Sequence, residues 1–293
     1  MKSFASFHPI VLFLYYLSVI CVSMFMIHPI IVLLSLIGSL LFFAFHTPMR
    51  IFWKDVGFYM LVLLLIAITN PLFVHKGETI LFFLNDNPVT LEAIVYGVFI
   101  AMLIVAVIFW SKSYSQLMTS DKFVYLFGKV IPKLSLVLSM ALRFIPIVKL
   151  QIKKVNQAQK TLGLYTSNSM TDRILSGVRT FNSIITWSLE NAIQQADAMK
   201  ARGYGLKGRT NFSLFRWSAR DTVIIAIMGS LFGAIMYVQS KHYFDFMYYP
   251  VLSEISVTWT SISQFLIVGS LMILPSLIEI KENLQWKYLK SKM

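Results

Sequence analysis

The chain has 293 residues, of which 57% are hydrophobic and 15% aromatic, while only 13% are charged. A soluble domain rarely has so many apolar and so few charged residues. The apolar runs are continuous, which argues against a membrane β-barrel, because apolar and polar residues alternate along its strands of about 10 residues. The composition therefore indicates an all-α integral membrane protein.

Continuous apolar runs divide most of the chain into candidate transmembrane helices, each of which needs roughly 20 residues. The first run is too long for the core of a signal peptide, and a second run follows it at once. Residues 75–90 include an Ile-Leu-Phe-Phe-Leu run that is too short to cross but long enough to dip into the interface. We expect six spans at about 9–27, 29–46, 56–74, 90–111, 222–240 and 255–278.

These spans define three regions: four spans in 1–111, a polar segment in 112–221, and two spans with a basic tail in 222–293. With the N-terminus inside, only Lys76 and Lys241 of the 26 Lys and Arg residues lie outside. Positive residues in short loops favour the cytoplasm, so we expect both termini on the cytoplasmic side of the cell membrane.

The net charge of +13 follows from this topology and from attraction to anionic membrane lipids. No nucleic-acid recognition motif or aromatic stacking platform accompanies the charge, so no nucleic-acid partner is expected.

The polar segment 112–221 predicts amphipathic helices at the cytoplasmic surface. One covers 134–160, where Pro146 should introduce a kink and Gly163 follows as a stop. Its apolar positions recur at helical spacing and are Leu142, Ile145, Ile152 and Val155. A second helix covers about 182–202 and ends at Gly203 and Gly205. Its apolar stripe is Ile185, Leu189, Ala192, Ala196 and Met199.

The predicted spans lack the features of a carrier or an enzyme. Their centres hold no Asp, Glu, Lys or Arg, and Glu92 and Glu279 lie at span ends. Ion-coupled carriers usually keep such residues at membrane depth. No phosphate-binding loop, dinucleotide fingerprint, HExxH or GxSxG motif occurs, and no cluster has metal-ligand spacing. We therefore predict no catalytic and no metal-binding residues, and any ATP hydrolysis must occur on another chain.

The stretch Ala-Met-Lys-Ala-Arg-Gly-Tyr-Gly (198–205) has two interpretations. In the first it is a helix cap, in which Lys200 and Arg202 stabilise the negative end of the helix dipole by roughly 0.3–1 kcal/mol and Gly203 ends the helix. In the second it is a docking tip. Ala201 and Gly203 leave the Arg202 guanidinium as the long side chain, and its donor fork suits a carboxylate of a partner.

The segment SLENAIQQADAMKARGYG (188–205) resembles the second signature of the transmembrane T component of energy-coupling factor (ECF) transporters, the EcfT/CbiQ family. The matching residues are Ser188, Leu189, Glu190, Ala196, Ala198, Met199 and Ala201 to Gly205. The segment LRFIPIVKLQIKKVNQAQKTLG (142–163) is similar to the first signature at Arg143, Phe144, Pro146, Ala158, Gln159 and Gly163, and His8-Pro9 resembles an N-terminal element of the family. Where the first signature normally has Arg before Gly, this chain has Leu162.

The resemblance implies that the chain is a non-catalytic scaffold between two cytoplasmic ABC ATPases and a small membrane S component that binds the substrate. ATP with Mg²⁺ would bind the ATPases, and this chain would hold no cofactor. The transported substrate would be a micronutrient such as a vitamin or a metal ion, which this sequence does not name.

The resemblance also implies roles for particular residues, because each signature helix is expected to end on one ATPase. We carry the docking arginine over to Arg202, between Ala201 and Gly203. At the first tip we expect Leu162 in an apolar pocket, Lys160 at its rim and Gly163 at the helix end. The residues expected to shape the coupling helices are Arg143, Pro146, Gln159, Ser188, Glu190 and Gly205.

Two other classes of function stay open at this point. One is a stand-alone membrane carrier or channel, which would transport without partner chains. The other is a membrane-embedded enzyme in which Arg143, Arg173 and Arg179 bind phosphates at the cytoplasmic interface.

Overall fold

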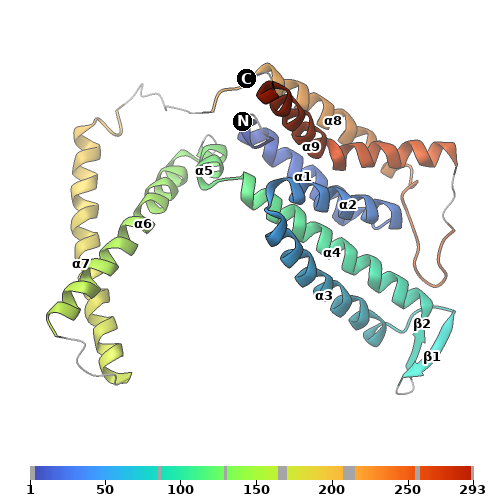
Figure 1. The fold of residues 1–293 in the computed structure, drawn as a ribbon, viewed down its shortest axis with the longest axis horizontal. Helices are drawn as coiled ribbons and strands as arrows, with labels where there is room; N and C mark the ends of the chain where they lie inside the picture. The colour runs from blue at the N-terminus through green and yellow to red at the C-terminus, as the bar shows by residue number, and fades with distance from the viewer. Residues whose placement is uncertain are drawn as a thin grey trace. The chain divides into compact units, whose positions relative to one another are not determined.

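The computed structural model describes residues 4–84, 87–128, 131–163, 170–206, 215–254 and 258–291. The chain divides into two compact units. One consists of Met1–Thr119 and Phe215–Met293, and the other of Ser120–Leu214. We refer to them as the membrane unit and the coupling unit. Figure 1 shows the described residues to be almost entirely helical, which confirms the all-α prediction.

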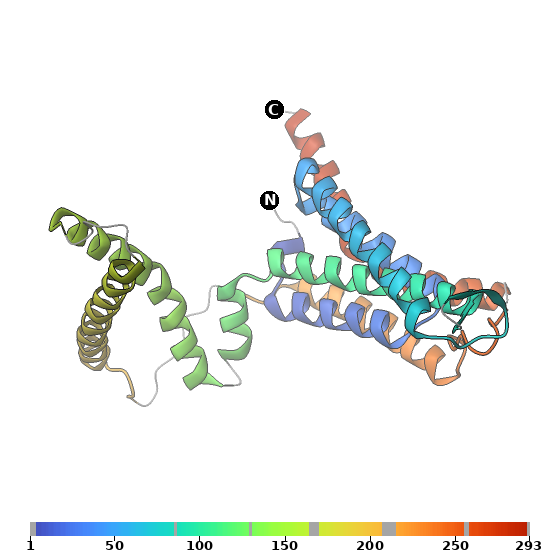
Figure 2. The same ribbon diagram turned by 90° about the horizontal axis from the view of Figure 1, so that it is seen from below.

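The described part of the membrane unit is a helical bundle with a small β-hairpin. Figures 1 and 2 show α1, α2 and α4 side by side, and α3 packs along α4. The helices are α1 (Pro9–Phe25), α2 (Pro29–His46), α3 (Met49–Phe73), α4 (Leu91–Leu117), α8 (Ala219–Ser240) and α9 (Trp259–Ser291), preceded by the short helix η1 (Phe4–Ser6).

Each predicted span falls on one of these helices, but their lengths differ from the prediction. The helix α1 has 17 residues, fewer than the other span-forming helices. Among the described residues, the six helices long and apolar enough to cross a membrane are α2, α3, α4, α6 (Pro132–Thr161), α8 and α9. The count of six agrees with the prediction. The members differ at α6, which is included, and at α1, which is apolar but one residue shorter than α2.

Two histidines begin the first two helices. His8 and His28 precede Pro9 and Pro29, and in each case the imidazole Nδ1 accepts a hydrogen bond of 3.3 Å from the backbone N–H two residues later. Proline is favoured at the first helical position because its missing N–H would have no partner there. The repeated His-Pro pair is thus a helix start in this chain.

The core of the membrane unit is aromatic and contains a small polar network. Trp110 on α4 is fully buried, and its indole N–H donates to the Ser35 hydroxyl at 3.2 Å, which also pairs with Ser23 at 2.7 Å. A Cβ atom added at Gly38 would lie 3.0 Å from the Cβ atom of Met272, so α2 and α9 approach closely at this point. Small residues and satisfied polar groups of this kind are typical of packed membrane helices.

A buried carboxylate fixes the N-terminal segment. The Glu279 Oε1 atom on α9 accepts the backbone N–H of Phe4 at 2.8 Å and lies 3.3 Å from the His46 Nε2 atom. In the same way Asp221 accepts the backbone N–H of His8 at 3.0 Å. Both contacts join the start of the chain to its last two helices.

Two strands form an antiparallel pair, in which β1 (Ile80–Leu84) pairs with β2 (Asn87–Thr90). Glu92 holds its base by accepting the backbone N–H of Thr79 at 3.2 Å and the Thr79 hydroxyl at 2.7 Å. Ile80 and Phe83 on β1 are exposed. The short apolar run, which was expected to dip into the membrane interface, is thus a strand of a hairpin that the sequence did not predict.

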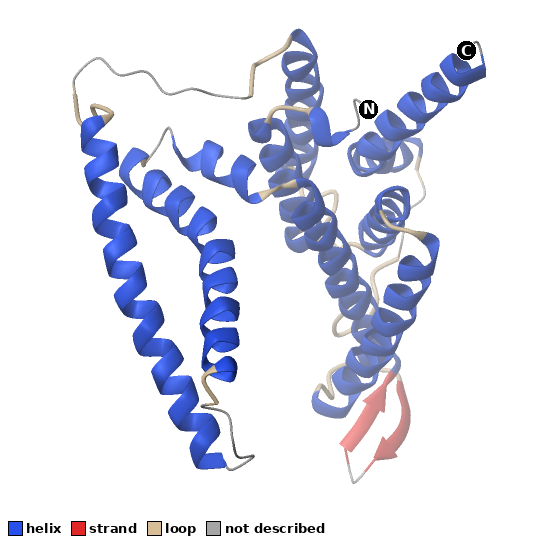
Figure 3. Cartoon of the chain, turned by 60° about the vertical axis from the view of Figure 1, so that its left-hand side comes forward, coloured by secondary structure: helices blue, strands red, loops and turns tan. Residues whose placement is uncertain are grey.

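Within 120–128, 131–163 and 170–206, the coupling unit contains three helices, of which two are long. They are α5 (Ser120–Gly128), α6 (Pro132–Thr161) and α7 (Met170–Ala201). Figure 3 shows α6 changing direction about midway along its length, where Pro146 stands in the sequence. The helix that the sequence predicted at about 182–202 is α7, and it begins earlier, at Met170, because the residues before 182 continue the same helix.

Candidate docking site at the ends of helices α6 and α7

Helices α6 and α7 pack antiparallel along a polar seam. The Ser176 hydroxyl donates to the Gln159 side-chain oxygen at 3.0 Å, and the Thr180 hydroxyl donates to the Asn156 side-chain oxygen at 2.9 Å. Further along, the rings of Phe144 and Trp187 stack with 5.7 Å between their centroids. From one contact to the next, the residue number on α6 decreases while that on α7 increases, so the two helices run in opposite directions.

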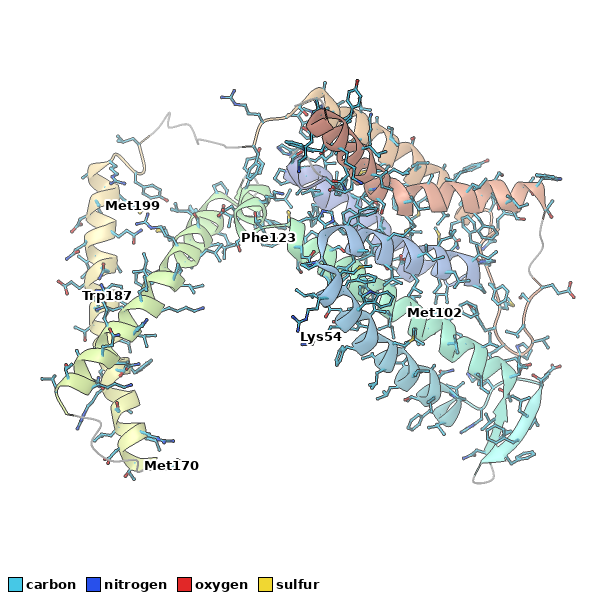
Figure 4. All side chains as sticks on the ribbon, viewed as in Figure 1. Lys54, Met102, Phe123, Met170, Trp187 and Met199 are labelled. Carbon is cyan, nitrogen blue, oxygen red and sulfur yellow. The ribbon has the colours of Figure 1, made fainter. Side chains whose placement is uncertain are left out.

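This arrangement separates the two candidate tips. Figure 4 labels Met170, Trp187 and Met199 along α7, and Trp187 lies between the other two. The end of α6 lies beside the start of α7, whereas the end of α7 lies at the far side of the pair. At about 1.5 Å per residue, the 32 residues of α7 place the two tips on the order of 40 Å apart.

The end of α7 is a complete Schellman cap. The backbone N–H of Tyr204 donates to the Met199 carbonyl at 3.0 Å, and that of Gly203 donates to the Lys200 carbonyl at 2.9 Å. Gly203 has a φ of +75°, which favours glycine. Arg202 is the cap residue immediately before it and is exposed. The cap fixes the backbone of Arg202 while leaving its guanidinium at the surface.

The end of α6 shares one of these two backbone bonds and the left-handed glycine, and it carries a different side chain. The backbone N–H of Gly163 donates to the Lys160 carbonyl at 3.1 Å, and Gly163 has a φ of +70°. Leu162 is therefore the counterpart of Arg202, and 73% of its surface is exposed. A leucine so exposed at a fixed helix end presents an apolar contact where α7 presents a guanidinium.

The other predicted docking residues lie around these caps. Ala201 is the last residue of α7 and is exposed, so it adds little bulk beside Arg202. Lys160 is exposed in the last turn of α6, next to the Leu162 tip. The structure thus gathers Ala201, Arg202 and Gly203 at one tip and Lys160, Leu162 and Gly163 at the other.

The residues expected to shape the helices have distinct positions. Gln159 is buried in the seam, where its side-chain oxygen accepts the Ser176 hydroxyl. Ser188 is half-buried and Glu190 is exposed on α7, and Gly205 has a φ of +97° just beyond the cap. Arg143 does not lie in the seam; it faces a cavity.

That cavity lies between the first half of α6 and the last third of α7. It has a volume of about 490 Å³, and its lining includes Arg143 and Arg202 together with Ser139, Asn191, Gln194 and Gln195. The two arginines are far apart in the sequence, so the sequence patterns gave no sign that they share one cavity.

The packing of the coupling unit is unusual because its buried side chains are polar. Within 120–128, 131–163 and 170–206, Gln159 and Ser176 are buried, and no hydrophobic side chain is. Ile185 and Leu189 of the predicted apolar stripe are 41% and 61% exposed. Met199 of the stripe lines the cavity beside α6, but Ile185 and Leu189 stay largely uncovered, and the side-chain contacts described for the seam are polar and aromatic.

No group of three or more metal-ligating side chains occurs among the residues that the structure describes. The geometry of the two tips suits contact with a partner surface.

Comparison with known proteins identifies the family of the chain. The sequence model of the CbiQ family, described as cobalt transport protein, matches residues 5–214. The energy-coupling factor transporter transmembrane protein EcfT of Listeria innocua is 32% identical over 191 residues, which cover 61% of this chain and 72% of the relative. The protein of the same name from Bacillus selenitireducens is 28% identical over 218 residues, which cover 70% of this chain and 80% of the relative.

Proposed function

The chain belongs to the EcfT/CbiQ family of transmembrane transporter subunits, and on this premise we propose that it couples two partner ATPases to an S component. In this role it is a non-catalytic scaffold of an ECF-type ABC importer for a micronutrient, a vitamin or a metal ion. ATP with Mg²⁺ binds the partner chains. The observation that carries the proposal is the Schellman-capped tip that presents Arg202 between Ala201 and Gly203.

The tip geometry favours docking into a narrow acidic groove. Gly203 holds the backbone in a conformation that ends the helix sharply, and Ala201 adds no long side chain beside Arg202. A guanidinium on such a rigid support loses little conformational entropy when it binds a carboxylate in two-pronged fashion.

The positions of the tips favour two partner sites and not one. The ends of α6 and α7 lie at opposite ends of an antiparallel pair, so a single small groove does not reach both. One ATPase would receive the Arg202 tip. The other would receive the Leu162 tip in an apolar pocket with Lys160 at its rim.

The proposed orientation places both termini and both tips in the cytoplasm. It rests on the bias of Lys and Arg toward one set of loops, with only Lys76 and Lys241 on the other side. Closure of the ATPases on ATP would then move both tips, and α6 and α7 would pass this motion to the S component in the membrane.

The experiment that tests this function is purification of the tagged chain from native membranes in mild detergent, followed by mass spectrometry of its companions. Two ABC-type ATPases and a small hydrophobic protein are expected, and the identity of the small protein indicates the substrate. Recovery of this chain alone, stable and monodisperse, would contradict the proposal.

A charge reversal at the tip sharpens the experiment. We expect Arg202→Glu to lower the recovered ATPase at least about tenfold, because it removes a charge-assisted contact and adds repulsion in an acidic groove. Arg179→Glu is the matched control, since Arg179 is exposed on the same helix and lines no part of the cavity at the tip. Normal ATPase recovery with Arg202→Glu would rule out the Arg202 tip as the docking element.

A further inference from the structure

The cavity between α6 and α7 has the character of an anion-binding site. Arg143 reaches it from α6 and Arg202 from α7, and the polar side chains around them are Ser139, Asn191, Gln194 and Gln195. No carboxylate lines the cavity. Within the described residues, neither arginine forms an ion pair.

The position of Arg143 in the sequence makes its placement more informative. It is the single charged residue between Lys133 and Lys149, in the apolar first half of α6, a helix that as a whole is long and apolar enough to cross a membrane. A charged side chain in such a stretch is expensive unless it faces a polar cavity or a counter-charge. Here it lines two neighbouring cavities: the one that it shares with Arg202, and a second one that Asp121 of α5 also lines.

Two guanidinium groups on one cavity repel each other until an anion lies between them. The amide side chains of Gln194 and Gln195 can donate further hydrogen bonds from the last turns of α7. A volume of about 490 Å³ is at the small end of ligand pockets and accommodates a few side chains of a partner.

We propose that this cavity receives an acidic side chain of the ATPase that docks on the Arg202 tip, and that Arg143 is a second docking arginine. The inference rests on the proposed function. It is favoured because Arg202 belongs both to the exposed tip and to the cavity lining, so the cavity is continuous with the proposed ATPase contact. Charge complementarity supports an acidic occupant, and the shared Arg202 supports an occupant from the ATPase.

The test compares ATPase recovery from native membranes for the wild-type chain and for Arg143→Ala, Arg143→Lys and Arg179→Glu. We expect Arg143→Ala to lower the recovered ATPase at least about tenfold, since truncating one partner of a buried charge pair at an interface commonly costs more than this. Arg143→Lys should recover only part of this loss, because lysine keeps the charge but lacks the two-pronged fork. Arg179→Glu should match the wild type.

A photo-crosslinking residue at position 143 tests the contact directly. A crosslink from position 143 to an ABC-type ATPase, identified by its peptide masses, is the expected result. The same residue at position 178, exposed on α7 and outside the cavity lining, should give no such product.

The failure of this inference is distinct from failure of the proposed function. If the wild-type chain brings down no ATPase, the proposed function fails. A second outcome is that the wild type recovers the ATPase, Arg202→Glu abolishes this recovery, and Arg143→Ala leaves it unchanged. In that case only the role of Arg143 as a second docking arginine is overturned. Loss of a bound anionic lipid from Arg143→Ala, seen by native mass spectrometry with unchanged ATPase recovery, would assign the cavity to a lipid headgroup and overturn the inference as well. If size-exclusion chromatography shows that Arg143→Ala does not fold, Arg143→Lys and the crosslink still test whether Arg143 contacts the ATPase.

Discussion

The membrane unit and the coupling unit differ in what they bury. The membrane unit has a continuous aromatic and aliphatic core around Trp110, Tyr15 and Phe42. The described coupling unit buries Gln159 and Ser176 and leaves large apolar side chains such as Phe181 and Ile193 more than 60% exposed. The membrane unit has an apolar core of its own, although side chains such as Phe25 and Phe73 are exposed, whereas the contacts described between α6 and α7 are hydrogen bonds and one ring stack.

This difference separates stability from interaction within one chain. Apolar side chains left uncovered on a helix indicate a surface meant for lipid or for another protein. A polar seam holds α6 and α7 in register without using their apolar faces. The membrane unit therefore provides the stable support, and the coupling unit provides surfaces that other molecules cover.

The largest expected effect lies in the core of the membrane unit. Trp110→Ala should destabilise the fold by about 3–5 kcal/mol, because it opens a cavity and leaves the Ser35 hydroxyl without its indole partner. Phe181→Ala is the matched change in the coupling unit and should alter stability by no more than about 0.5 kcal/mol. Thermal unfolding in detergent, followed by size-exclusion chromatography, measures both. Equal destabilisation by the two variants would refute the contrast between the units.

The next effect tests how the start of the chain is held. Glu279→Ala leaves the Phe4 N–H and the His46 ring without their buried partner, and we expect a loss of about 2 kcal/mol. Glu279→Gln retains an acceptor for Phe4 and should lose less. Hydrogen exchange of residues 4–8 measures the change, and unaltered protection in Glu279→Ala would show that the carboxylate is not the anchor.

A smaller effect is expected at the polar seam. Gln159→Ala should weaken the pairing of α6 with α7 by about 1 kcal/mol, because the Ser176 hydroxyl loses its acceptor. The double variant with Ser176→Ala should lose less than the sum of the two single changes. Hydrogen exchange of the first turns of α7 reports the weakening. Strict additivity of the two variants would mean that the side chains do not interact.

The smallest effects are of opposite sign at two glycines of the coupling unit. Gly203→Ala should destabilise the end of α7 by about 1 kcal/mol, since a φ of +75° is unfavourable for alanine and the new methyl group would lie 3.0 Å from Leu206 Cδ1. Gly177→Ala lies inside the same helix with nothing within 4 Å of the new methyl group, so it should stabilise α7 by about 0.5–1 kcal/mol. Local hydrogen exchange along α7 separates the two. A loss of protection in both variants would exclude the cap as the cause.

The sequence predicted the elements of the fold better than their contacts. Long apolar runs identify membrane helices because crossing a bilayer requires that length, and glycines after Thr161 and Ala201 identify the helix ends. The hairpin at 80–90 was not predicted, since five apolar residues alone do not distinguish a strand from a short interfacial segment. The helix caps made by His8 and His28 were missed because histidine is not among the common capping residues.

The candidate site was predicted one tip at a time. The motif around Arg202 is local, so its residues could be named from the sequence. The cavity shared by Arg143 and Arg202 depends on the antiparallel packing of α6 on α7. The apolar stripe through Ile185 and Leu189 suggested a packed face, whereas the seam uses Asn156, Gln159 and their partners, which no periodicity identifies.

The coupling unit is one uninterrupted stretch of chain, Ser120–Leu214, inserted between the two parts of the membrane unit. Recombination at only two junctions would exchange all of its contact surfaces together while leaving the aromatic core intact. Natural variation could therefore change the partners of such a protein separately from its bilayer fold. Chimeras between relatives are best joined near Thr119 and Phe215, so that each half keeps the neighbours with which it evolved.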